Sequence, residues 1–192
     1  GQGSHMASEF DVSDYLVEGQ NLLAVEVYKW AATSYLEDQD FWRLSGIFRE
    51  VYLYRTAQAY VEDYTITALL DNTYTDGVLK VDVDAIGDGL TLNFLFQEIN
   101  GKPIVMKSEE IVGGAAEFEF IVPDVKKWTA ETPEVYRLLI TITDDQGKSL
   151  DVREHVFGFR TIEVKGSRFL VNGEPVIMKG VNRHDTHPDR GY

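Results

Sequence analysis

The sequence predicts an all-β chain organised around an immunoglobulin-like β-sandwich of about seven strands. Its apolar runs are short, rich in Val, Ile, Tyr and Phe, and have a dominant period of two residues. From Tyr60 to Phe157 seven such runs follow at regular spacing, with Gly, Asp and Asn turn signals between them. Some alternate cleanly, as in Leu79, Val81 and Val83, which places one face on a core and the other in water. This spacing indicates an immunoglobulin-like or fibronectin-like sandwich.

Two apolar runs precede the sandwich and are expected to be strands, at residues 22–30 and 47–54. The aromatic and acidic stretch between them is too long for a hairpin turn, so it is predicted to be a functional or packing loop. The sandwich strands are expected at residues 60–69, 78–86, 90–97, 103–111, 116–122, 135–143 and 148–157.

The pattern changes after residue 160. A short hairpin is expected at residues 162–165 and 169–171, followed by an Asn172-Gly173 turn and one apolar strand at 175–181. That strand leads into a polar cluster that includes His184. Ionisable side chains at the carboxyl end of an apolar strand are typical of a TIM barrel, and one strand alone cannot close a barrel.

Composition excludes several classes of partner and site. The formal net charge is -14 at pH 7, and this negative field repels phosphate backbones and anionic membrane surfaces. We therefore expect no nucleic-acid partner and no membrane partner, and no run of about 18 apolar residues is present to span a bilayer. The chain has no Cys, so it can form neither a disulfide nor a thiolate metal site. A hydrophobic fraction of 44% suffices for one sizeable core.

The first eight residues read GQGSHMAS, which is typical of the tail that an expression vector leaves after tag removal. We expect residues 1–9 to be such a tail. A targeting signal of the natural protein cannot be read past it, so the sequence predicts no localisation.

Three stretches carry a resemblance to a known family. They are YLEDQDFWRLSGIFREV at residues 35–51, WTAETPEVY at 128–136, and GVNRHDTHP at 180–188, the last preceded by VFGFR at 156–160 and NGEP at 172–175. In this order and separation they resemble the bacterial β-galactosidases of glycoside hydrolase family 2.

The resemblance implies a division into domains. Residues 10–58 correspond to the C-terminal part of a sugar-binding jelly roll, 59–160 to an immunoglobulin-like sandwich, and 161–192 to the start of a truncated TIM-barrel catalytic domain. The chain is thus expected to be an internal piece of a larger enzyme. Its fold class is all-β, with partial jelly-roll strands and the first strand of a TIM barrel flanking the sandwich.

The same resemblance implies that the parent is a retaining β-glycosidase that hydrolyses terminal β-galactosides, with a β-glucuronidase or β-mannosidase as alternatives. Its acid/base and nucleophile are two Glu on later barrel strands, which this chain lacks. Retaining chemistry needs two carboxyl groups about 5 to 5.5 Å apart in a rigid setting, and no pair here has that setting. The chain alone is therefore expected to be an inactive scaffold.

Two residues match ligand contacts of the family. Asp40 matches an Asp that reaches from the jelly roll to the galactosyl 6-hydroxyl and a monovalent cation; the alternative is an Asp that accepts hydrogen bonds from loop amides. His184 matches a His near the galactosyl hydroxyls, where an imidazole can donate to an oxygen whose charge changes; the alternative is a structural His at a strand end.

The parent is expected to use Na⁺ and Mg²⁺, and the chain itself no cofactor. Members of the family often have an Asp where Ala32 stands. Its absence here puts in doubt a divalent-cation contact that some of them make at this position. The string His184-Asp185-Thr186-His187 contains good ligand types for a divalent cation, but Pro188 argues against a preformed site.

Two other features have ordinary structural interpretations. The aromatic residues Phe41, Trp42 and Phe48 are either a sugar-stacking platform or, as is more common, a core cluster. The neighbouring carboxylates Asp38/Asp40 and Glu109/Glu110 are expected to be solvated surface pairs.

Two other classes of protein compete with an enzyme fragment. One is a stand-alone carbohydrate-binding sandwich, and the other is a structural spacer, which describes residues 60–157 well when they are taken alone. We also expect self-association, because residues 22–30, 47–54 and 169–181 have lost the sheets that they would join and leave strand edges exposed.

Overall fold

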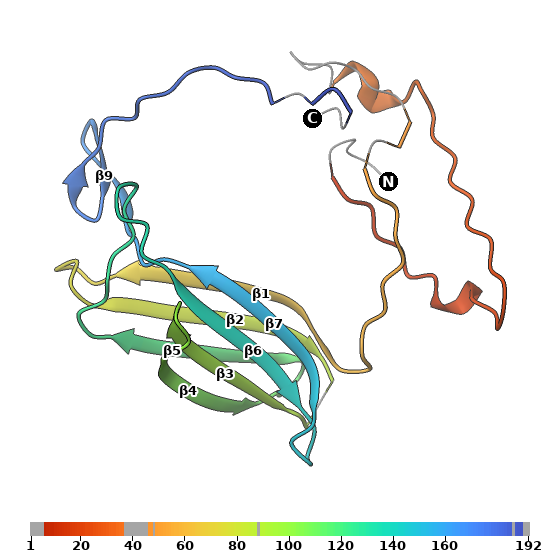
Figure 1. Ribbon diagram of the computed structural model, residues 1–192, viewed down its shortest axis with the longest axis horizontal. Coiled ribbons are helices and arrows are strands. Elements are labelled where there is room, and N and C mark those ends of the chain that lie inside the picture. The colour runs from red at the N-terminus through yellow and green to blue at the C-terminus, as the bar shows by residue number, and fades with distance from the viewer. Residues whose placement is uncertain (1–5, 37–45, 48, 88, 186, 190–192) are drawn as a thin grey trace. The chain divides into compact units, whose positions relative to one another are not determined.

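The computed structural model describes residues 6–36, 46–47, 49–87, 89–185 and 187–189 of the 192-residue chain. The chain divides into two compact units, one of Tyr54–Lys179 and one that combines Gly1–Leu53 with Gly180–Tyr192. Every strand found among the described residues belongs to the larger unit (Figure 1).

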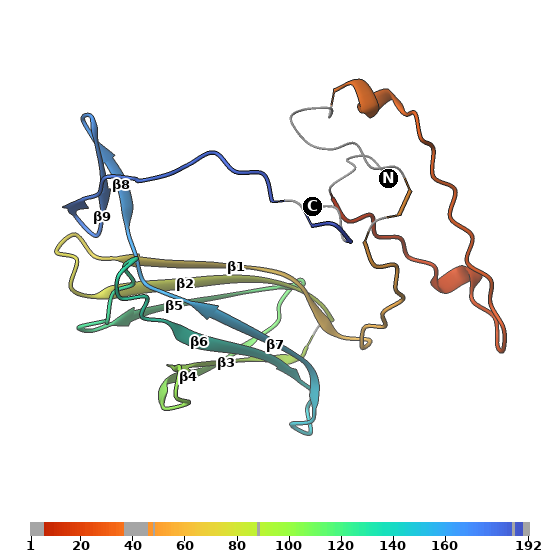
Figure 2. The ribbon, with the colours of Figure 1, turned by 45° about the horizontal axis from the view of Figure 1, so that its top comes forward.

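Two antiparallel sheets form the body of the larger unit and face each other as the layers of a sandwich (Figure 2). One sheet has the order β1-β2-β5, with β1 at Tyr60–Leu70, β2 at Gly77–Ile86 and β5 at Ala115–Val122. The other has the order β4-β3-β6-β7, with β4 at Pro103–Glu110, β3 at Thr91–Glu98, β6 at Tyr136–Thr143 and β7 at Ser149–Phe157. The predicted seven-strand immunoglobulin-like sandwich is confirmed. Its fourth strand pairs with the third strand and not with the first sheet.

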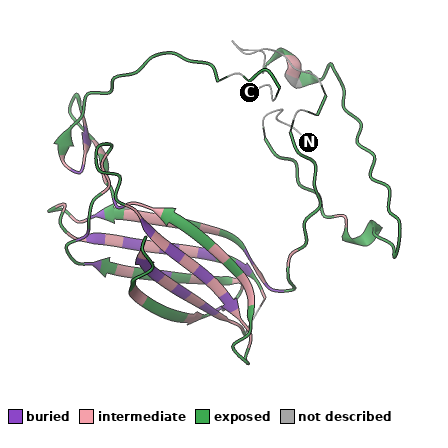
Figure 3. Ribbon diagram, viewed as in Figure 1, coloured by how far each residue is buried: buried purple, intermediate pink, exposed green. Residues whose placement is uncertain are grey.

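The core lies between the sheets and follows the period-two pattern of the sequence (Figure 3). Leu79, Val81 and Val83 of β2 are buried, as their alternation predicts. Two rings from opposite sheets meet at the centre, where Phe94 of β3 stacks on Phe118 of β5 with 4.9 Å between ring centroids. Because these contacts join the two layers, the sandwich holds together through one continuous core.

Side chains close the gap between the edge strands β1 and β7. The register of β1 shifts between Val61 and Asp63, and the backbone groups of Val61 bind β7 side chains instead. The Val61 amide donates to Asp151 Oδ2 at 2.9 Å, and Arg153 Nη2 donates to the Val61 carbonyl at 3.1 Å. Arg153 Nε also donates to Asp151 Oδ2. Both backbone polar groups of Val61, its amide and its carbonyl, therefore have hydrogen-bond partners at this bulge.

Tyr136 ties the start of β6 to the preceding loop. Its hydroxyl accepts a hydrogen bond of 2.9 Å from the backbone amide of Lys126, ten residues upstream. A Tyr near the start of the sixth strand that bonds back to the upstream backbone is a tyrosine corner, a hallmark of immunoglobulin-like sandwiches. Burial raises the pKa of this phenol.

A small three-stranded sheet follows the sandwich. It consists of β8 (Ile162–Lys165), β9 (Arg168–Val171) and β10 (Glu174–Pro175), in the order β10-β9-β8. The predicted hairpin is confirmed, but the apolar strand expected at residues 175–181 ends after Pro175. A barrel strand takes its hydrogen bonds from parallel neighbours. Here the Val176 amide still donates to the Phe169 carbonyl of β9 at 2.9 Å, and no strand of the described chain includes residues 176–181.

The smaller unit corrects two further predictions. The described residues of 22–30 and 47–54 form no strand, and they bear many exposed apolar side chains, among them Leu22 at 95% exposure. A strand exists only when a neighbouring strand takes its backbone hydrogen bonds, and these segments have no such neighbour in the described chain. Among the described residues of this unit the helical pieces are two 3-10 turns, η1 at Ser13–Tyr15 and η2 at Ala32–Tyr35. Neither these turns nor any other described helix has the length and apolarity that crossing a bilayer requires.

Candidate functional site

Asp40, the principal predicted ligand residue, lies outside the described residues. Its neighbour Asp38 and the aromatic residues Phe41, Trp42 and Phe48 also lie outside them. The interpretations of these five residues therefore remain predictions.

The loop that leads toward Asp40 is described as far as residue 36, and it folds into a local turn. Ser34 closes the turn twice, because its Oγ accepts from the Ala31 amide at 3.0 Å and its own amide donates to the Ala31 carbonyl at 3.1 Å. The rings of Trp30 and Tyr35 stack across the turn with 6.4 Å between centroids. Ala32 starts the 3-10 turn η2, and its methyl group offers no lone pair to a cation.

His184, the second predicted ligand residue, is exposed in an irregular segment. Its neighbours on either side, Arg183 and Asp185, form an exposed ion pair with 2.6 Å between Nε and Oδ1. Farther on, His187 Nδ1 accepts a hydrogen bond from the Asp189 amide. Because Asp185 and His187 each have a local partner, the geometry does not gather the predicted string into a ligand set. No group of three or more His, Asp or Glu suited to a metal ion occurs in the described part of the chain.

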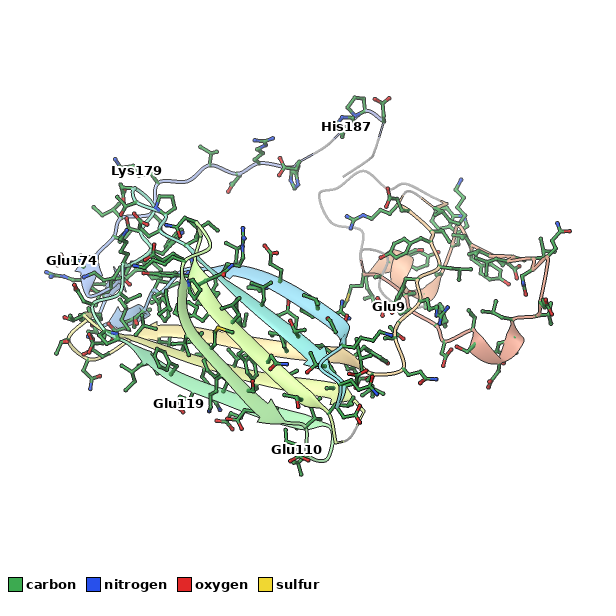
Figure 4. The ribbon with its side chains drawn as sticks, turned by 60° about the horizontal axis from the view of Figure 1, so that its bottom comes forward. Glu9, Glu110, Glu119, Glu174, Lys179 and His187 are labelled. Carbon is green, nitrogen blue, oxygen red and sulfur yellow. The ribbon has the colours of Figure 1, made fainter. Side chains whose placement is uncertain are left out.

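The neighbouring carboxylates Glu109 and Glu110 of β4 lie at the surface. Glu109 pairs with Lys107 along β4 at 2.6 Å, while Glu110 is exposed at the end of that strand (Figure 4). Successive residues of a strand point to opposite faces, so Glu109 and Glu110 do not form a facing pair. Both are surface carboxylates, in agreement with the prediction.

The outer face of the β1-β2-β5 sheet is strongly acidic. The strand register places Asp63 opposite Asp84 and Asp82 opposite Glu117, which brings like charges together. One cation lies among them, because Lys80 forms ion pairs with Asp82 at 3.2 Å and Glu117 at 3.3 Å. These two carboxylates raise the Lys80 pKa, Asp82 by the larger amount. All these side chains are at least partly exposed, so the face is a solvated surface.

An open groove of about 620 Å³ lies where the sandwich meets the hairpin. Its lining comes from β1, β7, the loop at Trp128 and the start of β8. Arg160 covers the Trp128 ring with 4.6 Å between the guanidinium carbon and the ring centroid. The residues that line the groove are Ile66, Thr67, Ala68, Leu69, Trp128, Val135, Val156, Phe157, Gly158, Arg160 and Ile162.

Three consecutive family models match the chain. The sugar-binding domain of glycosyl hydrolases family 2 matches residues 1–57, the central model of the family matches 59–160, and its TIM-barrel domain matches 162–192. The central match alone covers more than half of the chain. The chain belongs to glycosyl hydrolase family 2. The resemblance of the three motifs to this family is confirmed.

Curated family 2 relatives are similar along the whole chain. The β-galactosidase of Pseudoalteromonas haloplanktis is 39% identical over 100% of this chain, and that of Streptococcus thermophilus is 38% identical over 99%. The β-galactosidase of Priestia megaterium is 35% identical over 99%. In each case the chain spans only 19% of the relative's own length.

Solved structures of β-glucuronidases match the fold. The β-glucuronidase of Bifidobacterium dentium, in complex with coumarin-3-O-glucuronide, has a TM-score of 0.65 and 27% identity. It covers 70% of this chain, which in turn covers 23% of that structure. The β-glucuronidase of Lactobacillus rhamnosus has a TM-score of 0.60 and 27% identity, with coverage of 70% and 21%. This chain is thus similar both to proteins named β-galactosidase and to proteins named β-glucuronidase.

Sequence reasoning missed the residues that attach the hairpin to the sandwich. The Asn172-Gly173 pair was predicted to be a turn, and it is one, with positive φ at both residues. The sequence gives no sign that the Asn172 side chain is buried and reaches the Trp128 carbonyl. That contact joins positions 44 residues apart, and a local pattern does not reveal such a distant partner.

Proposed function

We propose that this chain is the scaffold portion of a family 2 retaining β-galactosidase, in which the sandwich connects the sugar-binding jelly roll to the catalytic barrel. The observation that carries the proposal is the identity of 35–39% with enzymes named β-galactosidase, over 99–100% of the chain. The barrel supplies the chemistry in this proposal. Its two catalytic Glu lie on strands beyond those present here, about 5 to 5.5 Å apart as retention requires.

A β-glucuronidase is the second candidate, because the solved structures with the same fold bear that name. Their identity of 27% over 70% of the chain is stronger support for the family than for glucuronide as the substrate. The deciding experiment assays the full-length gene product on nitrophenyl β-galactoside, β-glucuronide and β-mannoside. We expect the highest kcat/KM on the galactoside, and a preference for either other sugar would refute the assignment.

The chain by itself is proposed to be inactive. Contacts to substrate do not replace the missing acid and nucleophile, because binding without transition-state chemistry does not accelerate hydrolysis. Nitrophenol release from an aryl β-galactoside should equal the buffer blank at every concentration of the purified chain. Release that rises in proportion to chain concentration, and that persists after a second purification step, would contradict this proposal.

Asp40 is proposed to bind the galactosyl 6-hydroxyl and a monovalent cation, Na⁺, in the full-length enzyme, and His184 to bind galactosyl hydroxyls. Asp40→Asn keeps the shape and removes the charge, so it should lower kcat/KM at least about tenfold with little change in melting temperature. Asp38→Asn is the matched control on the same stretch and should retain near-normal kinetics. Normal kinetics of Asp40→Asn with a lowered melting temperature would favour the loop-structural role instead.

Mg²⁺ is proposed as a second ion of the parent, held by residues other than position 32. Ala32 has no carboxylate to offer a divalent cation. Removal of divalent cations by a chelator should therefore change activity less in this enzyme than in an Ala32→Asp variant reloaded with Mg²⁺.

Self-association is proposed through the exposed apolar segments at residues 22–30 and 47–54 and through the exposed part of 169–181. Within 169–181 the first three residues are β9, which already pairs with β8 and β10, so the exposed part is Val176 to Met178. Val176 to Met178 and the first of these segments expose apolar side chains, with Ile177 at 84% exposure, and exposed apolar segments favour association with a second copy. Light scattering across a dilution series should show a mass above that of the monomer. A monomeric mass at every concentration would refute this part of the proposal.

A further inference from the structure

The chain contains the dipeptide Asn-Gly twice, at Asn100-Gly101 and at Asn172-Gly173. An asparagine side chain reacts most readily with its own backbone in this sequence, because glycine has no Cβ to obstruct the approach of its amide nitrogen. A β-branched residue precedes each pair. Both pairs lie in turns between antiparallel strands, and both glycines have a positive φ. The intrinsic chemistry of the two pairs is therefore alike, and a difference in reactivity between them comes from the fold.

Asn100 lies in an exposed turn between β3 and β4. Its neighbours Gly101 and Lys102 are exposed too, and a Cβ added at Gly101 would meet no atom within 4 Å. Two backbone hydrogen bonds of 2.9 Å hold the turn, from the Gly101 amide to the Glu98 carbonyl and from the Glu98 amide to the Lys102 carbonyl. Both bonds close within a few residues, and β4 is the edge strand of its sheet. Such a turn opens locally at small cost in free energy.

The Asn100 side chain already folds toward the peptide that follows it. Its Oδ1 accepts a hydrogen bond of 2.9 Å from the Lys102 amide, two residues on, which forms a side-chain turn over Gly101. The same amide would donate to the negative charge that develops on Oδ1 when a nucleophile attacks the side-chain carbonyl carbon. Nδ2 donates to Glu98 Oε2 at 3.0 Å. Among the described residues both of these partners belong to the turn itself, so the side chain can move toward Gly101 without breaking a contact to another part of the fold.

Asn172, in the second Asn-Gly pair, is a buried anchor with a φ of 53°. Its amide donates to the Thr161 carbonyl at 2.8 Å, and its Oδ1 accepts from the Thr161 amide at 2.9 Å. Its Nδ2 donates to the Trp128 carbonyl at 3.0 Å. A Cβ added at Gly173 would lie 2.6 Å from the Tyr74 ring, so the space beside this peptide is filled. Asn172 can turn toward the Gly173 nitrogen only after the hairpin of β8 and β9 has left these partners.

We propose that Asn100 is a site of spontaneous deamidation in the folded protein, and that the fold protects Asn172 from the same reaction. When the Gly101 amide opens from the Glu98 carbonyl and loses its proton to a base in solution, its nitrogen forms a bond to Asn100 Cγ. The Cγ–Nδ2 bond breaks, and the amide nitrogen takes a proton from water and leaves as ammonia. The product is a succinimide ring. Water then opens the ring at either carbonyl, which leaves aspartate or isoaspartate at position 100.

The modification changes both charge and backbone at the turn between β3 and β4. Aspartate at position 100 cannot donate to Glu98, and it adds a second carboxylate beside Lys102, whose Nζ lies 3.6 Å from Glu98 Oε1. Isoaspartate also inserts a methylene into the main chain, which misaligns the two backbone bonds that close the turn. The core side chains of β3 point between the sheets, and Phe94 and Phe96 are buried there, so the damage stays at the sheet edge. None of this depends on which sugar the full-length enzyme cleaves.

Peptide mass spectrometry tests both sites in one sample of the 192-residue chain aged at mildly alkaline pH. In the folded chain the peptide with Asn100 should gain the acidic form at least about tenfold faster than the peptide with Asn172, whose reaction needs a larger opening of the structure. In concentrated urea the two peptides should react at similar rates, which is the control for intrinsic chemistry. Equal rates in the folded chain would overturn the proposal. A difference that persists unchanged in urea would overturn it too, because the fold would then not be its cause.

A substitution assigns the isoaspartate to its position. Asn100→Gln keeps the amide on an exposed side chain, and its extra methylene makes ring closure much slower. The variant should keep the parental melting temperature, and aged samples should lose most of the isoaspartate that an isoaspartyl methyltransferase labels in the parent chain. Asn182→Gln is the matched control, because Asn182 is also exposed but precedes arginine and not glycine, and it should leave the labelling near the parental level. Labelling of aged Asn100→Gln equal to that of the parent would refute the site.

Discussion

The sandwich and the segments of the smaller unit share the same kind of sequence but not the same structure. Both contain short apolar runs with β-branched and aromatic residues, as at residues 78–86 and 22–30. The first run is a strand with buried Leu79 and Val81, and the second forms no strand and leaves Leu22 exposed. A period of two thus makes a segment suitable for a sheet, and the presence of a neighbouring strand decides whether the sheet forms.

The largest effect should come from the centre of the sandwich core. Phe118→Ala removes a fully buried ring that stacks on Phe94, so it should lower the free energy of unfolding by about 3–5 kcal/mol. Leu22→Ala, in the other region, should change it by less than about 0.5 kcal/mol. Urea unfolding followed by circular dichroism measures both. Equal effects at the two positions would mean that residues 22–30 pack in solution.

The next effect should come from the buried Asn172 anchor. Asn172→Gly keeps the left-handed backbone accessible but leaves the Trp128 carbonyl and the Thr161 amide without their side-chain partner, so it should destabilise the hairpin by about 1–3 kcal/mol. Asn172→Ala should be worse by about 1 kcal/mol, because Ala resists a positive φ. Hydrogen exchange of the β8 and β9 amides reports this local stability. If the Asn172→Gly and Asn172→Ala variants lost the same amount of stability, the positive φ at residue 172 would make no contribution to the difference from the parent chain.

A smaller effect should follow at the side-chain bridge between β1 and β7. Arg153→Met removes the donor to the Val61 carbonyl and to Asp151. The Arg153 side chain is 41% exposed, so solvent screens its ion pair and the loss should be about 1 kcal/mol. Lys102→Met is the control, because it breaks the exposed ion pair with Glu98, and it should have almost no effect on thermal unfolding. If the control variant destabilised the fold as much as Arg153→Met, the effect would come from the loss of a positive charge and not from the loss of the bridge between β1 and β7.

The smallest effect concerns pH at the hairpin. The hydrogen bond from the Tyr74 hydroxyl, followed by the one from Lys165, lowers the pKa of Glu163 below its ordinary value of 4.5. A carboxyl whose folded pKa is depressed stabilises the fold above its unfolded pKa, and this contribution is lost as pH falls through the folded pKa. Protection of the β8 amides should therefore decline below about pH 4.5, where the unfolded carboxyl starts to protonate. Tyr74→Phe should flatten that dependence, and an unchanged profile would rule out Glu163 as its source.

These comparisons also show how far the sequence could predict the structure. The seven sandwich strands were predicted to within a residue or so of their observed limits, as for β2 and β6, because alternation is a local property. The strands expected at residues 22–30, 47–54 and 175–181 were wrong, because their partners are not set by local pattern. The same limit applies to Asn172, whose local sequence predicted the turn but not the Trp128 carbonyl as its distant partner.

For the candidate site, the family was predictable because the motifs at residues 35–51 and 180–188 are specific strings, and their order and separation, with 128–136 between them, fit the family. Two of the three contain stretches that the structure leaves outside its described residues. The roles of Asp40 and His184 therefore stay predictions. A ligand contact depends on residues that are distant in the sequence and close in space, and a short motif does not include those residues.

The acidic face of the β1-β2-β5 sheet carries a consequence for the solution behaviour of the molecule. Carboxylates that face each other across neighbouring strands, with Lys80 among them, repel one another at low ionic strength, and dissolved salt screens repulsion between exposed charges. The sandwich should therefore gain resistance to heat as sodium chloride is added, whereas the pairs that involve Lys80 weaken. The same screening lets the acidic faces of two molecules approach each other. Added salt that raises the thermal stability of one molecule therefore also weakens the electrostatic repulsion between molecules.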